Sequence, residues 1–203
     1  YGYDFSKDIQ ILTQSRKGIC GVFELNKLLQ DILNPKIEAS DEILVGNKLF
    51  RVNDKVMQTK NNYNLSFVDD EGEENFGVYN GDMGHIVFID KSSNKLTVEM
   101  DDKRLIDYSL EDLDNLELAY AITIHKSQGS EFKSVIIPMF DGYKLLQTRN
   151  LLYTAITRAK ENIVIVGDKN VMNNMIRNNT INSRYSNLEK RIQHFYGLVE
   201  DLL

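Results

Sequence analysis

The decisive stretch of the sequence is Thr123-Ile124-His125-Lys126-Ser127-Gln128-Gly129-Ser130-Glu131-Phe132, which continues the apolar run Leu116–Thr123. The apolar run predicts a strand, so the polar residues after it are expected at the carboxyl end of a parallel sheet, where open α/β sheets bind ligands. Hydroxyls and backbone N–H groups in such a loop can hold phosphates, and Gly129 allows close approach of the backbone. Without context, the same string is equally typical of a polar turn.

Strand and helix patterns alternate on both sides of this stretch. Ile9–Thr13 predicts a buried strand, and apolar residues from Val22 onward recur at helical spacing until Asn34-Pro35 ends them. Strand–loop–helix units of this kind build α/β domains with a parallel sheet. The further predicted elements are a strand at Val135–Met139, a helix at Asn150–Lys160, a buried strand at Ile163–Val166, a helix from Lys169, and an amphipathic helix carrying Leu188, Ile192, Phe195, Val199 and Leu202.

The middle of the chain changes character after about Ala39. Short strands and turns follow one another there, with Asn80-Gly81 as a tight turn and the acidic segment Asp69–Asn75 as a mobile loop. The predicted strands are Leu49–Val52, Lys55–Thr59, Gly77–Tyr79, His85–Asp90, Lys95–Met100 and Arg104–Tyr108. We therefore predict an α/β domain at residues 1–45 and 112–203, with a small antiparallel barrel inserted at residues 46–111.

Composition limits the classes of function. The net charge of −6 argues against a protein that coats nucleic acid by bulk attraction, although a narrow basic groove remains compatible with it. No apolar run is long enough to cross a membrane, and the single cysteine, Cys20, fits a reducing, cytoplasmic setting. His85 and His194 lack neighbours typical of metal ligands, so we expect no metal site. The start at Tyr1 resembles the cut end of a longer protein.

Three strings in this order resemble superfamily 1 helicases. Gln10-Ile11-Leu12-Thr13 with Arg16 and Gly21 is similar to motif IV, Thr123–Phe132 to motif V, and Leu151-Leu152-Tyr153-Thr154-Ala155-Ile156-Thr157-Arg158-Ala159-Lys160 to motif VI. Phe50–Gln58 and Val78–Gly84 resemble the RecD-type branch, which includes the exodeoxyribonuclease V alpha subunit. The resemblance implies a RecA-like parallel sheet of a P-loop NTPase-type second motor domain, interrupted by an SH3-like barrel.

The resemblance also implies roles in nucleotide binding. Arg158 is similar to the arginine finger that reaches the γ-phosphate, where a guanidinium stabilises charge on the transferred phosphoryl oxygens. Arg16 resembles the motif IV arginine that also faces the phosphates. Gly129 and Glu131 would face the nucleotide sugar, and Gln128 would lie between the nucleotide and the DNA. Spacing alone favours an exposed helix arginine in a surface ion pair at position 158, and it is equally typical of a solvated turn at position 16.

Other residues are implied in binding single-stranded DNA. Thr123, His125 and Ser127 resemble the strand-phosphate contacts of motif V, Lys126 can add a further contact, and His125 can equally be structural. In the barrel, basic residues lie near an aromatic that can stack on bases. These candidates are Arg51, Lys55, Lys60, Asn61 and Tyr63, for which a surface or core role is an open alternative.

One essential string is missing, because no Gly-x-x-x-x-Gly-Lys-Ser/Thr loop occurs in the 203 residues. We therefore expect ATP and Mg²⁺ to be bound mainly by an upstream RecA-like domain, and this fragment to be inactive alone. The expected partners are that domain, single-stranded DNA and subunits of a nuclease/helicase complex, with DNA repair and recombination as the setting. The resemblance implies 5′-to-3′ translocation. The alternatives are a relaxase-helicase, a Pif-like helicase or a non-catalytic adaptor.

Overall fold

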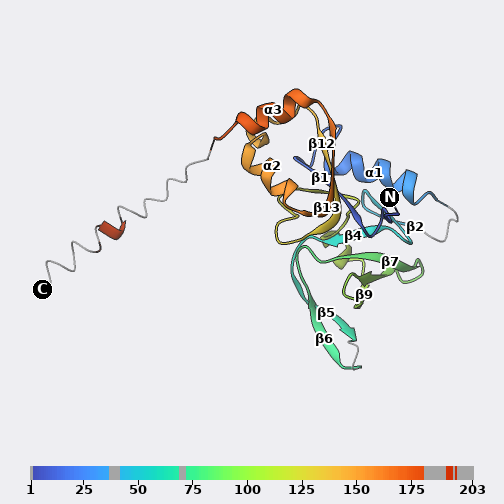
Figure 1. The fold of residues 1–203 in the computed structure, drawn as a ribbon. Helices are drawn as coiled ribbons and strands as arrows, with labels where there is room; N and C mark the ends of the chain where they lie inside the picture. Colours follow the sequence, from blue (N-terminus) through green and yellow to red (C-terminus); the bar gives the residue numbers. More distant parts are fainter. Residues whose placement is uncertain (1, 37–41, 69–71, 181–190, 194, 196–203) are drawn as a thin grey trace, which may run out of the picture.

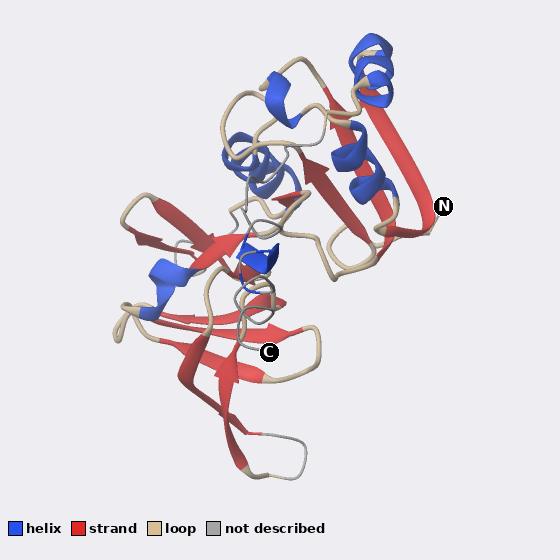
Figure 2. Cartoon of the chain, turned by 90° about the vertical axis from the view of Figure 1, so that its left-hand side faces the viewer, coloured by secondary structure: helices blue, strands red, loops and turns tan. Residues whose placement is uncertain are grey.

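The computed structural model describes residues 2–36, 42–68, 72–180, 191–193 and 195. Two bodies are visible, an α/β layer and a smaller β domain beside it (Figures 1 and 2). Each body has its own core of buried side chains, the first built around Leu12, Ile137 and Leu152 and the second around Phe50, Ile86 and Val98. Among the described residues, no helix is long and apolar enough to span a membrane.

The α/β layer contains a four-stranded parallel sheet in the order β11-β1-β12-β13. The helix α1 lies on one side of it, and α2 and α3 lie on the other (Figure 1). The strands are β1 (Ile9–Thr13), β11 (Ala121–Thr123), β12 (Phe132–Met139) and β13 (Ala159–Gly167), and the helices are α1 (Val22–Leu33), α2 (Arg149–Ile156) and α3 (Lys169–Arg177), with a short 3-10 helix η3 (Lys144–Leu146). This is the α/β fold class that the sequence predicts.

The α2 helix ends earlier than its sequence pattern predicts. Thr148 caps its amino end by accepting a hydrogen bond from the Leu151 N–H at 3.3 Å, a role for which threonine is well suited. The prediction that the helix extends to Lys160 is wrong, because Ala159 already pairs with Phe132 in the sheet. Arg158 therefore lies between the helix and β13, where its side chain is set by both elements.

The strand β13 differs from its prediction in burial. Ile163 to Val166 were expected to be buried, but their exposed fractions are 38–49%. The reason is position: β13 is the edge strand of the sheet, and the described residues cover its two faces only in part. The predicted carboxyl-terminal amphipathic helix falls mostly outside the described residues, so that prediction is not tested.

The β domain combines one larger sheet with two hairpins, one of which projects from it as a ribbon (Figure 2). The larger sheet has the order β10-β4-β7-β8-β9 and is antiparallel throughout. Its strands are β4 (Lys55–Gln58), β7 (Met83–Asp90), β8 (Lys95–Met100), β9 (Leu105–Tyr108) and β10 (Leu116–Leu118), with the 3-10 helix η2 (Asp112–Asn115) before β10; the hairpins are β2 (Glu42–Val45) with β3 (Lys48–Arg51), and β5 (Asn62–Val68) with β6 (Glu74–Val78).

Most strands of the β domain coincide with their predictions to within a few residues, and two were missed. The two strands without a predicted counterpart are β2 and β5. The predicted loop Asp69–Asn75 is wrong at its end, because Glu74 and Asn75 belong to β6. Pairing with β5 explains this, since cross-strand hydrogen bonds extend a strand into polar residues that carry no apolar alternation.

The run Leu116–Thr123 forms two strands, although a single one was predicted. Leu116–Leu118 pairs with β4 of the β domain, and Ala121–Thr123 pairs with β1 of the parallel sheet. Two buried amides satisfy the backbone between them: Asn26 Nδ2 donates to Leu118 O and Ala121 O at 2.9 Å, and Gln10 Nε2 donates to Ala119 O at 3.0 Å. The apolar pattern is continuous because both strands are buried, so the break carries no hydropathy signal. The domain division at residues 45/46 and 111/112 stays a prediction.

A buried carboxylate joins the two bodies close to this crossing. Asp54 in the β domain accepts hydrogen bonds from Gln30 and Asn34 of the α1 region and from the Tyr120 hydroxyl. The Arg51 backbone N–H is a fourth donor, at 2.7 Å. Burial raises the pKa of Asp54, while these donors stabilise its charged form. The orientation of the β domain thus depends on a network that spans both bodies.

Candidate functional site

The loop after β11 is a compact turn held by its own backbone. The Ser127 N–H donates to Thr123 O at 3.2 Å, and the Ser130 N–H donates to Ser127 O at 3.0 Å. Gly129 has φ +90°, a conformation that favours glycine, and a Cβ added there would meet no atom within 4 Å. Ser127 is fully buried, and its hydroxyl donates to Ile124 O at 2.8 Å. Its side chain therefore supports the turn and does not face solvent.

Three other predicted residues of this loop line one pocket with Arg16. The pocket has a volume of about 350 Å³ and includes Thr123, His125 and Lys126 from the loop and Met57 from the β domain. His125 is exposed, and Thr123 and Lys126 are half-buried. The polar residues expected at the carboxyl ends of β1 and β11 are therefore brought together, with the β domain as one wall. We call Arg16, Glu117, Thr123, His125 and Lys126 the Arg16 site.

Lys126 ties this loop to the β domain. Its ammonium donates to Thr59 O at 3.2 Å and to the side-chain oxygen of Asn80. Burial lowers the pKa of Lys126, while the carboxylate of Glu117 opposes this shift. The loop and the β domain are thus in direct polar contact.

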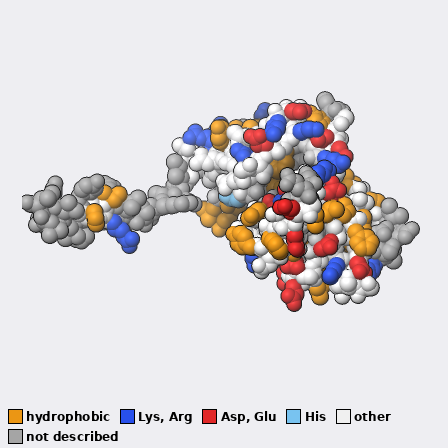
Figure 3. Space-filling view, turned by 90° about the horizontal axis from the view of Figure 1, so that it is seen from below, with side chains coloured by type: hydrophobic (Ala, Val, Ile, Leu, Met, Phe, Trp, Pro, Cys, Tyr) orange, Lys and Arg blue, Asp and Glu red, His pale blue; other side chains and the backbone are white. Residues whose placement is uncertain are grey.

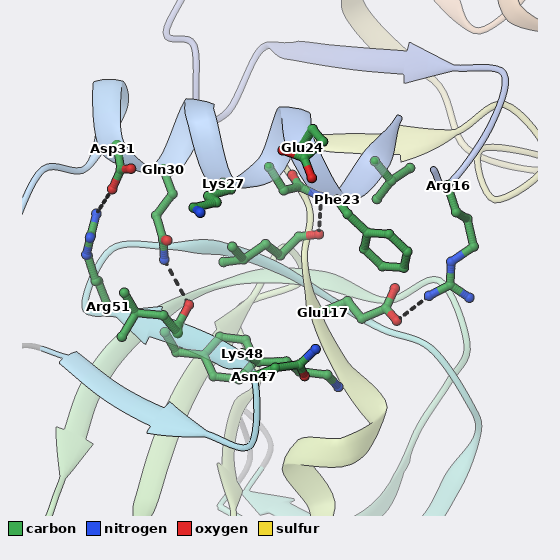
Figure 4. Close-up of a pocket in the computed structure, with 15 residues that line it drawn as sticks. Arg16, Phe23, Glu24, Lys27, Gln30, Asp31, Asn47, Lys48, Arg51 and Glu117 are labelled. Carbon is green, nitrogen blue, oxygen red and sulfur yellow. Dashed lines mark hydrogen bonds and ion pairs between the residues drawn. The ribbon is translucent and has the colours of Figure 1, made fainter. Parts of the chain in front are cut away.

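Arg16 is exposed and already has an anionic partner. Its guanidinium is 2.6 Å from a Glu117 oxygen and lies 5.0 Å from the centre of the Phe23 ring, and 56% of its side-chain surface is accessible. It stands at one end of a larger pocket of about 690 Å³ between α1 and the hairpin β2–β3 (Figure 4). Lysines, arginines and carboxylates alternate along that pocket, so its walls carry both signs of charge.

Arg158 is half-buried and bonded only to uncharged groups. Its Nη1 donates to Ser130 O at 3.1 Å, its Nε donates to Thr154 O at 3.3 Å, and its Nη2 approaches the Thr157 hydroxyl at 3.4 Å. In the described part of the chain, none of the ion pairs involves Arg158. The guanidinium thus contacts the loop after β11, and no carboxylate of the described residues is paired with its positive charge.

The two predicted arginines lie apart. Arg16 follows the carboxyl end of β1, whereas Arg158 precedes the amino end of β13, and all strands of this sheet are parallel. Near Arg158, Glu131 forms an exposed ion pair with Lys160 at 3.3 Å, and Gln128 and Gly129 are exposed. We call Ser130, Glu131, Arg158 and Lys160 the Arg158 site.

The barrel candidates divide into exposed and buried residues. Lys60, Asn61 and Tyr63 are exposed beside the loop contact, whereas Arg51 and Lys55 are 9% and 4% exposed. Those two basic side chains serve the interior: Arg51 donates to Asn34 O, and Lys55 donates to Ile9 O at 3.3 Å. Arg51 and Lys55 are therefore less accessible to a DNA strand than Lys60, Asn61 and Tyr63, and any role of theirs in binding stays a prediction.

Sequence reasoning assigned no role to two residues that complete this surface, Tyr79 and Asn80. Tyr79 is 48% exposed and packs edge-to-face against Tyr63, while Asn80 accepts the hydrogen bond from Lys126. Asn80 was predicted only as part of the Asn80-Gly81 turn, and the aromatic Tyr79 directly before that turn was the available signal. Acidic, basic and hydrophobic side chains are interspersed over the described part of the face in Figure 3.

Comparisons with known families agree with this architecture. Residues 25–100 match the SH3 domain of ATP-dependent RecD-like DNA helicases, and residues 118–166 match the C-terminal domain of UvrD-like helicases. The first match covers most of the β domain, and the second covers β11, β12, α2 and nearly all of β13. The first match also includes most of α1, so the two matches together extend over parts of both bodies of the structure.

Sequence relatives agree with the two domain matches. The chain is 35% identical over 159 residues to the ATP-dependent RecD2 DNA helicase of Deinococcus radiodurans, covering 78% of this chain and 20% of that protein. It is 26% identical over 165 residues to the RecBCD enzyme subunit RecD of Buchnera aphidicola, covering 81% and 26%. The chain thus spans about a fifth to a quarter of these relatives.

A solved structure shares the fold. The Pif1 helicase from Bacteroides, solved with ADP-AlF3 and single-stranded DNA, superimposes with a TM-score of 0.56 at 22% identity, over 97% of this chain and 47% of that one. The fold, the two domain matches and the relatives indicate the same family. This chain belongs to the RecD-like helicase family, whose SH3 domain it contains together with a UvrD-like C-terminal helicase domain.

Proposed function

We propose that this chain is the second motor domain of an ATP-dependent DNA helicase, and that Arg158 is its arginine finger. The observation that carries the proposal is the state of that guanidinium, which is half-buried and held by the carbonyls of Ser130 and Thr154 without a carboxylate partner. A charge removed from bulk water is usually paired, so an unpaired one favours an anionic ligand. A phosphate reaching Arg158 would supply that counter-charge.

The chain's own residues fit part of a nucleotide site. Its 203 residues contain no phosphate-cradling Gly-x-x-x-x-Gly-Lys-Ser/Thr loop and thus no hydroxyl of that loop for Mg²⁺, which assigns ATP and Mg²⁺ mainly to another domain of the intact protein. ATP supplies the γ-phosphoryl group, on which negative charge spreads during transfer. Arg158 would stabilise that charge through its planar fork of donors. Gln128, Gly129 and Glu131 are exposed nearby and are our candidates for contact with the nucleotide.

The same loop provides a route from nucleotide to DNA. Arg158 contacts it at Ser130, and Thr123, His125 and Lys126 line the pocket at its other end. We assign strand contacts to these three residues and to Lys60, Asn61 and Tyr63, while Ser127 positions the turn. A cleft that closes on ATP would move Ser130 through Arg158 and so alter the grip on one strand, giving translocation with 5′-to-3′ polarity.

The first experiment replaces Arg158 in the intact protein that carries this chain. Arg158→Ala should lower the DNA-stimulated ATPase kcat by about 10³-fold or more, the range measured for arginine fingers in GTPases. The dissociation constant for single-stranded DNA should change by less than about threefold, because the finger does not touch the strand. Arg149→Ala is the matched control, since Arg149 is an exposed arginine at the start of α2, the helix that precedes Arg158. An unchanged turnover rate would favour a non-catalytic adaptor.

The isolated chain provides the second experiment. Purified residues 1–203 should show negligible ATP hydrolysis and at most weak binding to single-stranded DNA. Robust hydrolysis by this chain alone would contradict the assignment of the phosphate-binding loop to another domain. Pull-down of the intact protein would separate a stand-alone helicase from a subunit of a larger enzyme, since the Buchnera relative is named as a subunit of the RecBCD enzyme.

A further inference from the structure

Two exposed tyrosines stand together on the β domain beside the loop contact. Tyr63 lies on β5 and Tyr79 directly follows β6, with ring centres 6.1 Å apart and an angle of 76° between the ring planes. Their exposed fractions are 64% and 48%, so neither ring belongs to the core. Edge-to-face pairing holds the rings in fixed relative positions while leaving π-surface open to solvent.

The turn that follows Tyr79 is fixed at its base. The Asp82 N–H donates to Tyr79 O at 3.0 Å, and the Tyr79 N–H donates to an Asp82 carboxylate oxygen at 3.0 Å. Asp82 is held in turn by Arg104 at 2.9 Å. The turn therefore presents Tyr79 and Asn80 from a constrained backbone, which limits how far either side chain can move independently of the β domain.

A continuous series of hydrogen bonds runs from Lys126 to Tyr63. The Lys126 ammonium donates to the Asn80 side-chain oxygen, and the Asn80 backbone N–H donates to Asn61 Oδ1 at 2.8 Å. Asn61 Nδ2 completes the series by donating to the Tyr63 hydroxyl at 2.9 Å. The oxygen and the nitrogen of the Asn61 amide are thus both hydrogen-bonded. Through them, the position of Asn80 is linked to the position of the Tyr63 ring.

Lys126 belongs to the loop that Arg158 contacts, at its other end. It is half-buried, and two of its three donors are directed to Thr59 and Asn80 of the β domain. A lysine used in this way acts as a strut between the loop and the β domain. Its sequence-predicted role, a contact with a DNA phosphate, leaves those two hydrogen bonds unexplained.

We propose that Tyr63 and Tyr79 form a stacking platform for the bases of single-stranded DNA, and that Lys126 sets its position through Asn80 and Asn61. Tyr79 is thereby a second base-contacting residue, Asn80 is a positioning residue, and Lys126 and Asn61 position the rings in addition to the strand contacts assigned to them above. Base-on-aromatic stacking tolerates any sequence, as a translocating motor requires. The inference rests on the proposed function, because it needs both a strand to stack and a nucleotide-dependent loop.

The platform is tested by strand affinity in the intact protein. Tyr79→Ala should raise the dissociation constant for oligothymidylate about tenfold, within the range for loss of one stacked base, and Tyr79→Phe should keep wild-type affinity. Tyr143→Ala is the matched control, because Tyr143 is 63% exposed in the loop before η3. Equal affinities for Tyr79→Ala and wild type would overturn the platform.

The strut is tested by coupling to the nucleotide. We expect wild type to change its strand affinity when a non-hydrolysable ATP analogue is added. Asn80→Ala should reduce that change severalfold, whereas Asn80→Asp, which keeps an acceptor for Lys126, should retain it. The double variant Lys126→Met/Asn80→Ala should reduce the nucleotide-dependent change in strand affinity no further than either single variant does, since both substitutions break the same series of contacts. Multiplicative effects, or equal defects in Asn80→Ala and Asn80→Asp, would overturn the strut.

Failure of the proposed function is distinguishable from failure of this inference. If wild type does not bind oligothymidylate, or if Arg158→Ala leaves ATPase unchanged, the helicase assignment itself is wrong. If both of those results hold as expected but Tyr79 and Asn80 variants behave as wild type, only the platform and its strut are wrong. Thermal unfolding of each variant checks that the β domain remains folded.

Discussion

The Arg16 site and the Arg158 site each present an arginine that resembles a phosphate-facing residue, yet the two arginines are held in different ways. Arg16 is exposed and paired with the Glu117 carboxylate at 2.6 Å. Arg158 is half-buried and held by two backbone carbonyls and a hydroxyl. A side-chain carboxylate competes with a phosphate for the guanidinium, whereas carbonyls leave its charge uncompensated and fix its direction.

The difference indicates which arginine is ready to bind an anion. Arg158 needs no ion pair to be broken before it meets a phosphate, and little rotamer entropy remains to be lost. Arg16 must exchange Glu117 for a new partner, or bind while Glu117 remains beside it. We therefore rank Arg158 above Arg16 as the residue that acts on the transferred phosphoryl group.

The most direct test of this ranking keeps the positive charge at position 158 and removes the planar guanidinium with its forked donors. Arg158→Lys in the intact protein should lower the ATPase kcat by roughly 10²-fold, comparable with removing one preorganised donor from an active site, because lysine cannot reproduce the planar geometry. Arg16→Lys should lower it by less than tenfold. Steady-state ATPase assays at saturating DNA measure both. A larger loss at Arg16 than at Arg158 would reverse the ranking.

A second prediction concerns a buried lysine beside the Arg158 site. Lys55 lines a pocket of about 260 Å³ with Ser130 and Glu131, and burial lowers its pKa from 10.5 to about 8. Below pH 8 the folded state must bury a charged ammonium, at a cost of about 3 kcal/mol that is relieved as pH rises towards 10.5. Raising the pH from 7.5 to 9.5 should therefore stabilise wild type by about 2 kcal/mol relative to Lys55→Met.

Denaturant unfolding of the 203-residue chain at several pH values measures this difference. Only the gap between wild type and Lys55→Met is interpreted, because other groups titrate in both proteins alike. Lys95→Met is the control, since Lys95 is an exposed lysine on β8 of the same domain. If the difference in free energy of unfolding between wild type and Lys55→Met is constant with pH, Lys55 is not a buried cation. The environment of the Arg158 site would then differ less from that of the Arg16 site in its electrostatics.

Local sequence patterns predicted the elements well where one physical cause dominated. Ile9–Thr13 and Lys95–Met100 agree with their predicted bounds, because apolar content and alternation respectively coincide with pairing in the sheet. Patterns failed where tertiary pairing determined the structure. Ala159, for example, continues the helical pattern of the preceding residues but forms the first residue of β13. They also failed at Leu116–Thr123, where two buried strands of different sheets share one apolar run.

The candidate site was predicted in part. Resemblance indicated Arg158 and the loop after β11, and the structure adds that Ser130 connects them. Burial could not be predicted from spacing: Ser127 and Lys55 are polar residues that face the interior, and their sequence neighbours give no sign of it. The partners of Lys126 were equally hidden, because Thr59 and Asn80 lie 67 and 46 residues away along the chain.

The smallest expected effect comes from releasing Arg16. Glu117→Gln removes the anionic partner while keeping a side chain of the same shape, and the free energy of unfolding should change by less than about 1 kcal/mol, because the Arg16 side chain is 56% exposed and solvent screens the pair. The apparent affinity for ATP should rise by no more than a few fold, since Arg16 then meets a phosphate without competition. Chemical denaturation and ATP titration measure the two quantities. A gain in turnover approaching the loss in Arg158→Lys would mean that Glu117 restrains a second finger, and that the two sites differ in regulation more than in readiness.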